Sequence, residues 1–340
     1  MTADTPQRAI FDESARYHRF LEYHVDGELR PGRAGAAVAS ALQAARSSVD
    51  RPARIVVAFG RRLWSALAPD SMPSDLRDFE TIRGVAGHVA PATQCDLWIW
   101  LQGDGEDENV ARTLALHAAL RDDFDLALEQ PGFTYFESRD LIDFEDGTAN
   151  PKDDDARTEA AVVPGGPGAG GSIVLVQRWV HDLDRFAALD IAAQEAVIGR
   201  TKADSIELEG DDMPPDSHVS RTDVKKDGVA LKVYRRSAPY ATLARHGLYF
   251  LAFARARERH QIQLERMFGV SGDGLHDRLI EFSRADTGSY LFAPGERMLA
   301  EAIGSESGAV EDAGSDSVGP DAVGPETSRS GMSASEVTGS

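Results

Sequence analysis

The stretch DFEDGTANP, residues 143–151, lies near the middle of the chain and marks the boundary between its two halves. Its Asp-Gly and Asn-Pro pairs are turn signals, because Asp and Asn accept local backbone hydrogen bonds while Gly and Pro suit the backbone angles of turns. The pattern predicts a tight turn that can aim the Asp146 carboxylate into a cavity. We therefore end an N-terminal half at residue 150.

A β-α-β-β-α-β order is predicted for this N-terminal half, residues 1–150. Apolar runs and apolar alternation indicate its strands, and apolar residues at helical spacing indicate its helices. The strands are expected at residues 18–25, 54–60 and 96–103, and the helices at residues 32–49 and 108–123.

The second half repeats the theme after a linker at residues 151–172, which is charged and then rich in Gly and Pro. Within a C-terminal half at residues 173–300, strands are expected at 172–182, 218–224, 230–236 and 246–257, and helices at 184–200 and 260–269. Two such units fit a duplicated ferredoxin-like fold of the α+β class, with antiparallel sheets.

Composition narrows the class of protein. The net charge of −20 excludes a nucleic-acid partner, because phosphate binding needs clustered Lys and Arg. No run of apolar residues is long enough for a membrane span, and the first residues lack the apolar core of an export signal. The single cysteine, Cys95, cannot form an internal disulfide. We expect a cytoplasmic protein without a membrane partner.

The last segment, residues 301–340, has a different composition from the rest. It consists mainly of Ser, Gly, Ala and acidic residues and contains no aromatic residue. Such a segment buries too little apolar surface to offset the entropy of ordering. We therefore predict a disordered acidic tail.

The turn at 143–151 and the segment HVSRTDVKKDGVALKVYRRSAP, residues 218–239, together resemble the dye-decolorizing peroxidases, a family of haem enzymes. The resemblance covers about residues 15–298 and includes PGFTYFESRDL, GGSIVLVQRW, AVIGRTK, HGLYFLAF and DTGSYLFAP. It implies a duplicated ferredoxin-like fold of the dimeric α+β barrel type. It also implies one haem b per chain, held by the C-terminal half.

His218 is the residue that this resemblance assigns as the ligand of the haem iron. A haem protein commonly holds the iron through one imidazole, whose other ring nitrogen donates to a carboxylate or carbonyl. His218 follows a Pro-rich loop and opens the predicted strand 218–224. His246 is the alternative ligand, whereas His117 and His260 lie in helical patterns and are expected to be structural.

Asp146 and Arg235 are the expected catalytic pair. Peroxide cleavage needs a group that moves a proton and a cation that stabilises the charge on the leaving oxygen, and a carboxylate beside a guanidinium supplies both. Arg235 is preferred to Arg236 because it matches the family's position before the Pro, and alternation puts the two side chains on opposite strand faces. Ser237 shares the face of Arg235 and is expected to hydrogen-bond a distal water. Without the resemblance, Asp146 reads as an Asx-turn and Arg235 as a surface ion pair.

The same resemblance bears on three further positions, two at the haem and one in the turn. Arg200 corresponds to an arginine that pairs with a haem propionate, although it also fits a cation at a helix C-terminus. Asp277 is either the partner of the His218 imidazole or an ordinary acid at a helix N-terminus. Asp143 replaces the first Gly of the family's motif, and Asp tolerates a positive φ at modest cost.

The resemblance leaves two readings of function. The first is a peroxidase that reduces hydrogen peroxide and oxidises bulky organic donors such as dyes and phenolics through a ferryl intermediate, with Trp or Tyr side chains relaying electrons. The second is a haem-handling protein for storage, delivery or iron release. Relatives commonly form homo-oligomers. An encapsulin shell is a weaker expectation for a partner, because the tail offers only AIGSES, residues 302–307, without flanking leucines.

Overall fold

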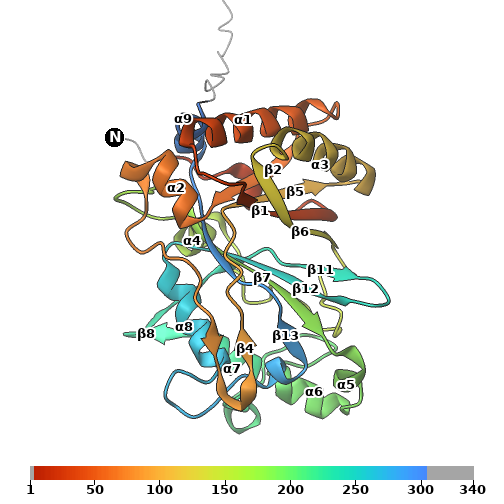
Figure 1. Cartoon of the computed structure of the whole chain (residues 1–340). Helices are drawn as coiled ribbons and strands as arrows, with labels where there is room; N and C mark the ends of the chain where they lie inside the picture. The colour runs from red at the N-terminus through yellow and green to blue at the C-terminus, as the bar shows by residue number, and fades with distance from the viewer. Residues whose placement is uncertain (1–3, 305–340) are drawn as a thin grey trace, which may run out of the picture. The chain divides into compact units, whose positions relative to one another are not determined.

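A computed structural model describes residues 4–304 of the chain (Figure 1). The N-terminal half forms four antiparallel strands in the order β2-β5-β1-β6. This is the strand order of a ferredoxin-like unit with β-α-β-β-α-β connectivity, as the sequence predicts. The strands are β1 (Tyr17–Val25), β2 (Arg54–Phe59), β5 (Leu97–Gly103) and β6 (Phe124–Phe133).

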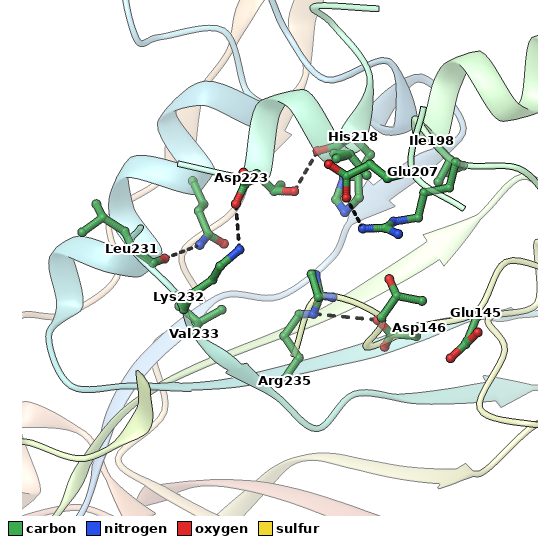
Figure 2. Close-up of a pocket in the computed structure, with 16 residues that line it drawn as sticks. Glu145, Asp146, Ile198, Glu207, His218, Asp223, Leu231, Lys232, Val233 and Arg235 are labelled. Atoms are coloured by element: carbon green, nitrogen blue, oxygen red, sulfur yellow. Dashed lines mark hydrogen bonds and ion pairs between the residues drawn. The ribbon is translucent and has the colours of Figure 1, made fainter. Parts of the chain in front are cut away.

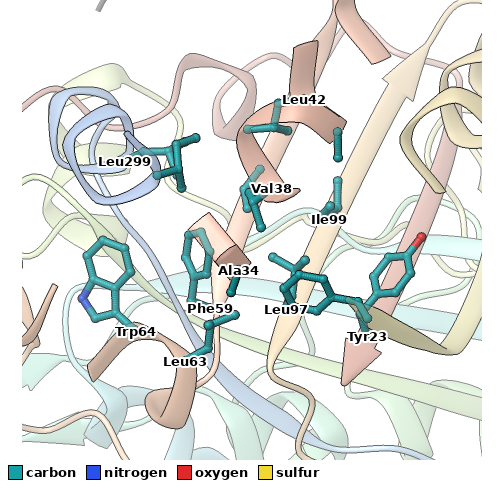
Figure 3. Packing of buried hydrophobic residues seen from close by; sticks show 14 of the residues in the cluster. Tyr23, Ala34, Val38, Leu42, Phe59, Leu63, Trp64, Leu97, Ile99 and Leu299 are labelled. Carbon is teal, nitrogen blue, oxygen red and sulfur yellow. The ribbon is translucent and has the colours of Figure 1, made fainter. Parts of the chain in front are cut away.

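Two helices cover one face of this sheet, α1 (Pro31–Ser47) and α3 (Glu106–Leu120), and they lie side by side (Figure 1). The shorter α2 (Arg61–Leu67) and α9 (Glu296–Ile303) complete this layer. Figure 3 shows how Val38 and Leu42 of α1 pack toward Leu97 and Ile99 of the sheet. All seven residues of β5 are buried, because its alternate side chains enter two different cores.

The C-terminal half builds a second sheet of the same kind, in the order β10-β12-β7-β14. Its pairs are antiparallel, with β11 beside β12 and β13 beside β7. The strands are β7 (Ser172–His181), β10 (Tyr234–Arg235), β11 (Ala238–Ala241), β12 (His246–Ala254), β13 (Ser283–Ala285) and β14 (Ser289–Ala293). Helix α8 (Arg257–Met267) and several shorter helices cover its outer face.

The two sheets join into one ten-stranded sheet that nearly closes into a barrel. Phe292 of β14 pairs with Phe59 of β2 at one junction. At the opposite edges, Gly132 of β6 lies so close to β11 that an added Cβ would be 3.1 Å from the Ala238 Cβ. Aromatic rings fill the interior, where Phe20 and Tyr249 stack with centroids 4.1 Å apart. The duplicated fold of the dimeric α+β barrel type is thereby confirmed.

Three predicted elements of the C-terminal half are wrong in type or continuity. The strand expected at 230–236 is interrupted, because β9 (Val229–Ala230) ends at Ala230 and β10 (Tyr234–Arg235) is only two residues long. Residues 218–224, expected as a strand, begin with helix α7 (His218–Thr222). The Ser217 side chain caps this helix by accepting from the Ser220 amide, and that outweighs the β-branched residues in the segment. The predicted helix 184–200 is two helices, α5 (Leu183–Ala187) and α6 (Ile191–Ile198), because Asp190 caps a new N-terminus.

Two predicted boundaries also differ. The linker 151–172 contains helix α4 (Asp154–Ala161), capped by Asp153. Helix α9 runs three residues past the expected tail boundary at residue 300, because Ile303 is buried in the same core as α1. The rest of the predicted tail, from residue 305, lies outside the described residues.

Short pairs of strands flank the second half. They are β3 (Ile82–Arg83) with β4 (Val89–Ala90), and β8 (Lys225–Lys226) with β9 (Val229–Ala230). Within residues 4–304, no helix has the length and apolar character that crossing a membrane requires.

Candidate active site

The candidate site is a two-part cavity on the outer face of the C-terminal sheet, under α6, α7 and α8. Its outer part has a volume of about 330 Å³ and carries several charged side chains, and its inner part has a volume of about 140 Å³ and mainly apolar walls. Both parts are lined by the same residues where they adjoin, namely Glu145, Asp146, Ile198, His218, Thr222, Arg235 and Gln263.

His218 is the first residue of α7 and lies on one side of the cavity. Its Nδ1 is 2.6 Å from Oδ2 of Asp277, whose carboxylate is fully buried. This hydrogen bond assigns the proton to Nδ1 and leaves Nε2 as a lone-pair donor. Oδ1 of Asp277 accepts from the Leu279 amide at 2.8 Å. Asp277 therefore fills both roles between which the sequence left a choice.

Helix α7 is held in place by Arg221, a buried residue that no motif of the sequence indicates. Its guanidinium donates to the Arg266 carbonyl of α8 and to the Asp273 carboxylate. It also reaches the Leu275 carbonyl, two residues before Asp277. A five-residue helix has few bonds of its own, so these contacts fix the position of His218 against its partner.

The turn 143–151 presents Asp146 as the sequence predicts. Asp143 adopts a φ of 72°, so Asp serves at a position where positive φ favours Gly. The Asp146 amide donates to the Ser138 carbonyl, and Oδ1 accepts from the Gly147 amide at 2.7 Å. The Asx-type contact thus orients the carboxylate, which still lines the cavity.

Arg235 reaches the cavity from β10, across from His218. Its Nε lies 3.9 Å from Oδ1 of Asp146, which is an ion pair but too long for a hydrogen bond. Among the described residues, this buried Nε has no hydrogen-bond partner. Figure 2 shows Arg235 and Asp146 together on the side of the pocket opposite His218.

Asn150 connects the turn to the strand that carries Arg235. Its side-chain amide donates to the Arg235 carbonyl at 2.8 Å and accepts from the Arg235 amide at 3.0 Å. The side chain therefore occupies the place that a neighbouring strand would take in a sheet. The sequence predicts only a turn residue at Asn150, because the pairing with Arg235 joins residues that are distant in the chain.

The strand directions separate Arg235 from its neighbours. Arg236 points to the opposite face, where it donates to the Ile10 carbonyl and lies over the Trp100 ring, so the two neighbours lie on opposite faces as alternation predicts. Ser237 does not line either part of the cavity; its Oγ accepts from the Leu251 amide at 3.4 Å. It faces instead a neighbouring cleft of about 390 Å³ that Asp146 and Arg235 also line.

Arg200 lines the outer part of the cavity but already has protein partners. Its guanidinium donates to the Ser205 carbonyl at 2.9 Å and to the Glu207 carboxylate. It follows Gly199, whose left-handed conformation ends α6. The Arg200 guanidinium can therefore bind an anion at the mouth of the cavity if that anion competes with the Glu207 carboxylate.

The inner part is a predominantly apolar slot with two buried histidines. Burial lowers the pKa of His260 to about 4, so this ring is neutral, and Nε2 lies 3.3 Å from the Ile173 carbonyl. Burial alone would raise the pKa of Asp140, but His181 beside it lowers that pKa below its ordinary value. The apolar wall consists of Ile142, Phe144, Leu175, Trp179, Leu248, Phe250, Leu264, Met267, Leu279 and Ile280.

The other candidate histidines lie elsewhere. His246 begins β12 and is near the Thr242 carbonyl, outside both parts of the cavity. His117 lies in α3 beside the Tyr23 hydroxyl. His260 is buried in α8 as expected, although it contributes to the cavity wall.

Two family models together match nearly the whole of the described chain. Residues 28–134 match the family model "Dyp-type peroxidase, N-terminal", and residues 137–298 match "Dyp-type peroxidase, C-terminal". The boundary between the two matches falls within the segment that leads into the Asp146 turn.

Similar proteins and solved structures agree with these matches. A dye-decolorizing peroxidase of Mycolicibacterium paratuberculosis is 33% identical over 70% of this chain and 68% of its own length, and one of Brevibacterium linens is 31% identical over 75% and 70%. A dye-decolorizing protein from V. cholerae is 36% identical, with a TM-score of 0.78 over 87% of this chain and 99% of its own. A variant of Rhodococcus jostii DypB, solved in complex with heme, is 31% identical, with a TM-score of 0.80 over 88% and 99%.

Proposed function

Because the chain belongs to the Dyp-type peroxidase family, we propose that His218 ligates the haem iron and that Asp146 and Arg235 act on peroxide. We further propose that Asp277 orients and polarises the ligand and that Arg200 meets a haem propionate. Ser237 is proposed to act from the adjoining cleft, through water shared with Arg235. The supporting observation is the placement of His218 across the cavity from the Asp146–Arg235 pair (Figure 2).

The protein is a haem peroxidase that reduces hydrogen peroxide and oxidises an organic donor, and haem is its cofactor. The first of the two readings from the sequence is therefore confirmed. The cavity suits this cofactor, because its inner slot is apolar and its outer part is charged, as the two edges of a haem require. The Arg235 Nε has no hydrogen-bond partner among residues 4–304, and the bond at Nδ1 leaves the His218 Nε2 as the lone-pair nitrogen. A group between them would use these two nitrogens.

When bound, haem supplies the redox-active iron that receives the oxidising equivalents of peroxide. The residues handle the protons and the charge. In the proposed mechanism, the Asp146 carboxylate would accept the proton from one oxygen of the peroxide and return it to the other, which leaves. The Nε–H of Arg235 donates to the leaving oxygen and stabilises its developing negative charge. The pair at 3.9 Å is close enough for both groups to contact one small molecule.

His218→Gly tests the assignment of the ligand. The variant should purify with little haem, without a normal Soret band, and added imidazole should restore haem binding by occupying the space of the lost ring. His246→Gly is the matched control, since this histidine lies outside the cavity, and should keep full haem. A His218→Gly protein with a normal five-coordinate spectrum in the absence of imidazole would rule out the assignment.

The division at residues 150 and 172, a cytoplasmic location, a homo-oligomer and an encapsulin shell as partner stay predictions. Light scattering coupled to size-exclusion chromatography measures the oligomeric state directly. Co-expression with an encapsulin shell tests loading.

A further inference from the structure

A second cleft, distinct from the peroxide side, opens next to the inner part of the haem cavity. Its volume is about 500 Å³, within the range of small-molecule sites. Residues of the β3–β4 hairpin and of β13 line it. Strands β4 and β13 contact each other and lie side by side in Figure 1. Trp179, Ile280 and Ser283 line both this cleft and the inner cavity, so one layer of side chains separates them.

The cleft has the walls of an aromatic binding site. Its apolar lining consists of Val89, Pro91, Trp179, Phe268, Ile280 and Ala285. Trp179 lies between Phe268, with ring centroids 6.0 Å apart, and the haem cavity, and is 7% exposed. A planar ring can be buried against these apolar surfaces, and stacked aromatic contacts contribute beyond area alone.

A proton acceptor is present at the rim of this cleft. The His88 ring stacks on His276 with centroids 5.5 Å apart, and His276 is held by Glu281 at 3.1 Å. Burial lowers the pKa of His88 below its ordinary value; His276 and Arg185 lower it further, and Glu281 opposes them. The imidazole is therefore mainly neutral near neutral pH and can accept a proton.

We propose that this cleft binds a phenolic electron donor, with Trp179 as the wall shared with the haem and His88 as the acceptor of the phenol proton. The inference rests on the proposed haem site. In each turnover step the phenol would give one electron across Trp179 to the haem that peroxide has oxidised and one proton to His88, and would leave as a phenoxyl radical. His88 would release that proton to solvent before the next phenol binds. Two phenols and one peroxide thus give two phenoxyl radicals and two waters, while the donor never enters the side occupied by Asp146 and Arg235.

Filling the cleft tests binding. Val89→Trp places an indole among its walls, and Val229→Trp is the control because Val229 is 62% exposed in β9, outside the cleft. The Kd for 4-methoxyphenol is measured by calorimetric titration of the resting protein. It should rise about tenfold or more in Val89→Trp, which corresponds to a loss of about 1.4 kcal/mol of binding free energy. It should be unchanged in the control. An unchanged Kd in Val89→Trp, in a protein with wild-type Soret band and melting temperature, would overturn the proposal.

A second variant tests proton transfer to His88 separately from binding of the phenol. His88→Gln should keep the Kd for the phenol but slow its oxidation by about 10²-fold, in the range of a lost general base. Ferrocyanide, which gives up an electron without a proton, should reduce the oxidised haem at the wild-type rate. Equal slowing of both donors, or of neither, would refute the role of His88.

The two proposals fail in different ways. The rate of reaction with peroxide is measured first, without a donor, and depends on the haem site alone. A wild-type protein that does not react with peroxide would contradict the proposed function, while the phenol titration still decides whether the cleft binds. A protein that reacts with peroxide but binds no phenol would contradict only the inference about the cleft.

Discussion

Asp277→Asn should raise the reduction potential of the iron that His218 is proposed to hold. The Asp277 carboxylate is fully buried and lies 2.6 Å from the His218 Nδ1, so its negative charge makes the imidazole a stronger electron donor. Ferric iron carries more positive charge than ferrous iron and is stabilised more by this donation. Loss of the charge therefore favours the ferrous form.

The size of the shift follows from the effect of such partners on metal sites. Loss of a partner of this kind typically lowers metal affinity about 10- to 100-fold. We assign this loss to the ferric form, which the charge stabilises more. A tenfold change in the ratio of ferric to ferrous stability corresponds to about 59 mV for one electron, so the potential should rise by about 60–120 mV. Asn keeps the cap on the Leu279 amide, because Asn and Asp cap helices about equally well. The substitution thus changes the charge with little effect on the local fold.

Spectroelectrochemical titration of the haem protein measures the potential. Asp286→Asn is the matched control: it removes a carboxylate that binds Arg178 and Arg245 and lines neither part of the cavity, and it should shift the potential much less. If Asp277→Asn shifts the potential no more than Asp286→Asn does, the buried carboxylate does not tune the iron and the reasoning is wrong.

Arg235→Leu should slow the reaction with peroxide by about 10²- to 10³-fold, and Asp146→Asn by less, since each removes one group of the pair; stopped-flow rates within about twofold of wild type for both would contradict the mechanism. Burial raises the pKa of Glu22 from 4.5 to about 7, although the hydrogen bond from Tyr249 acts in the opposite direction. The folded state therefore binds this proton more tightly than the unfolded state does. The free energy of unfolding should then fall by on the order of 3 kcal/mol as the pH rises between these values, and Glu22→Gln should abolish most of the fall in denaturant titrations. A chain that ends at residue 300 should be less stable by about 2–4 kcal/mol than one that ends at residue 304, because it lacks the buried Ile303; equal melting temperatures would show that the last turn of α9 contributes nothing.

Local patterns predicted much of the fold. The run at 96–103 became β5, and the Ala-rich stretch at 32–49 became α1, because apolar spacing along one segment decides which face can be buried. The alternation of side chains along a strand correctly predicted that Arg235 and Arg236 point to opposite faces. The family resemblance, rather than periodicity, pointed to His218 and to the haem.

The errors arose where short-range capping competes with strand propensity. Val219 and Thr222 suit a strand, yet the Ser217 cap and the buried Arg221 contacts make residues 218–222 a helix. The Ser217 cap is visible in the sequence. The Arg221 contacts are not, because their partners lie about fifty residues away along the chain.

Sequence alone therefore determined the elements that depend on neighbouring residues: most strands and helices, the turn that presents Asp146, and a positive φ tolerated at Asp143. Tertiary structure decided every partnership in the site. His218 meets Asp277 only after the C-terminal half has folded, and Asn150 meets Arg235 only after the two halves have packed together. The physical reason is that hydrogen bonds and ion pairs act over a few ångströms in space, and the distance between two residues along the chain does not report their distance in the fold.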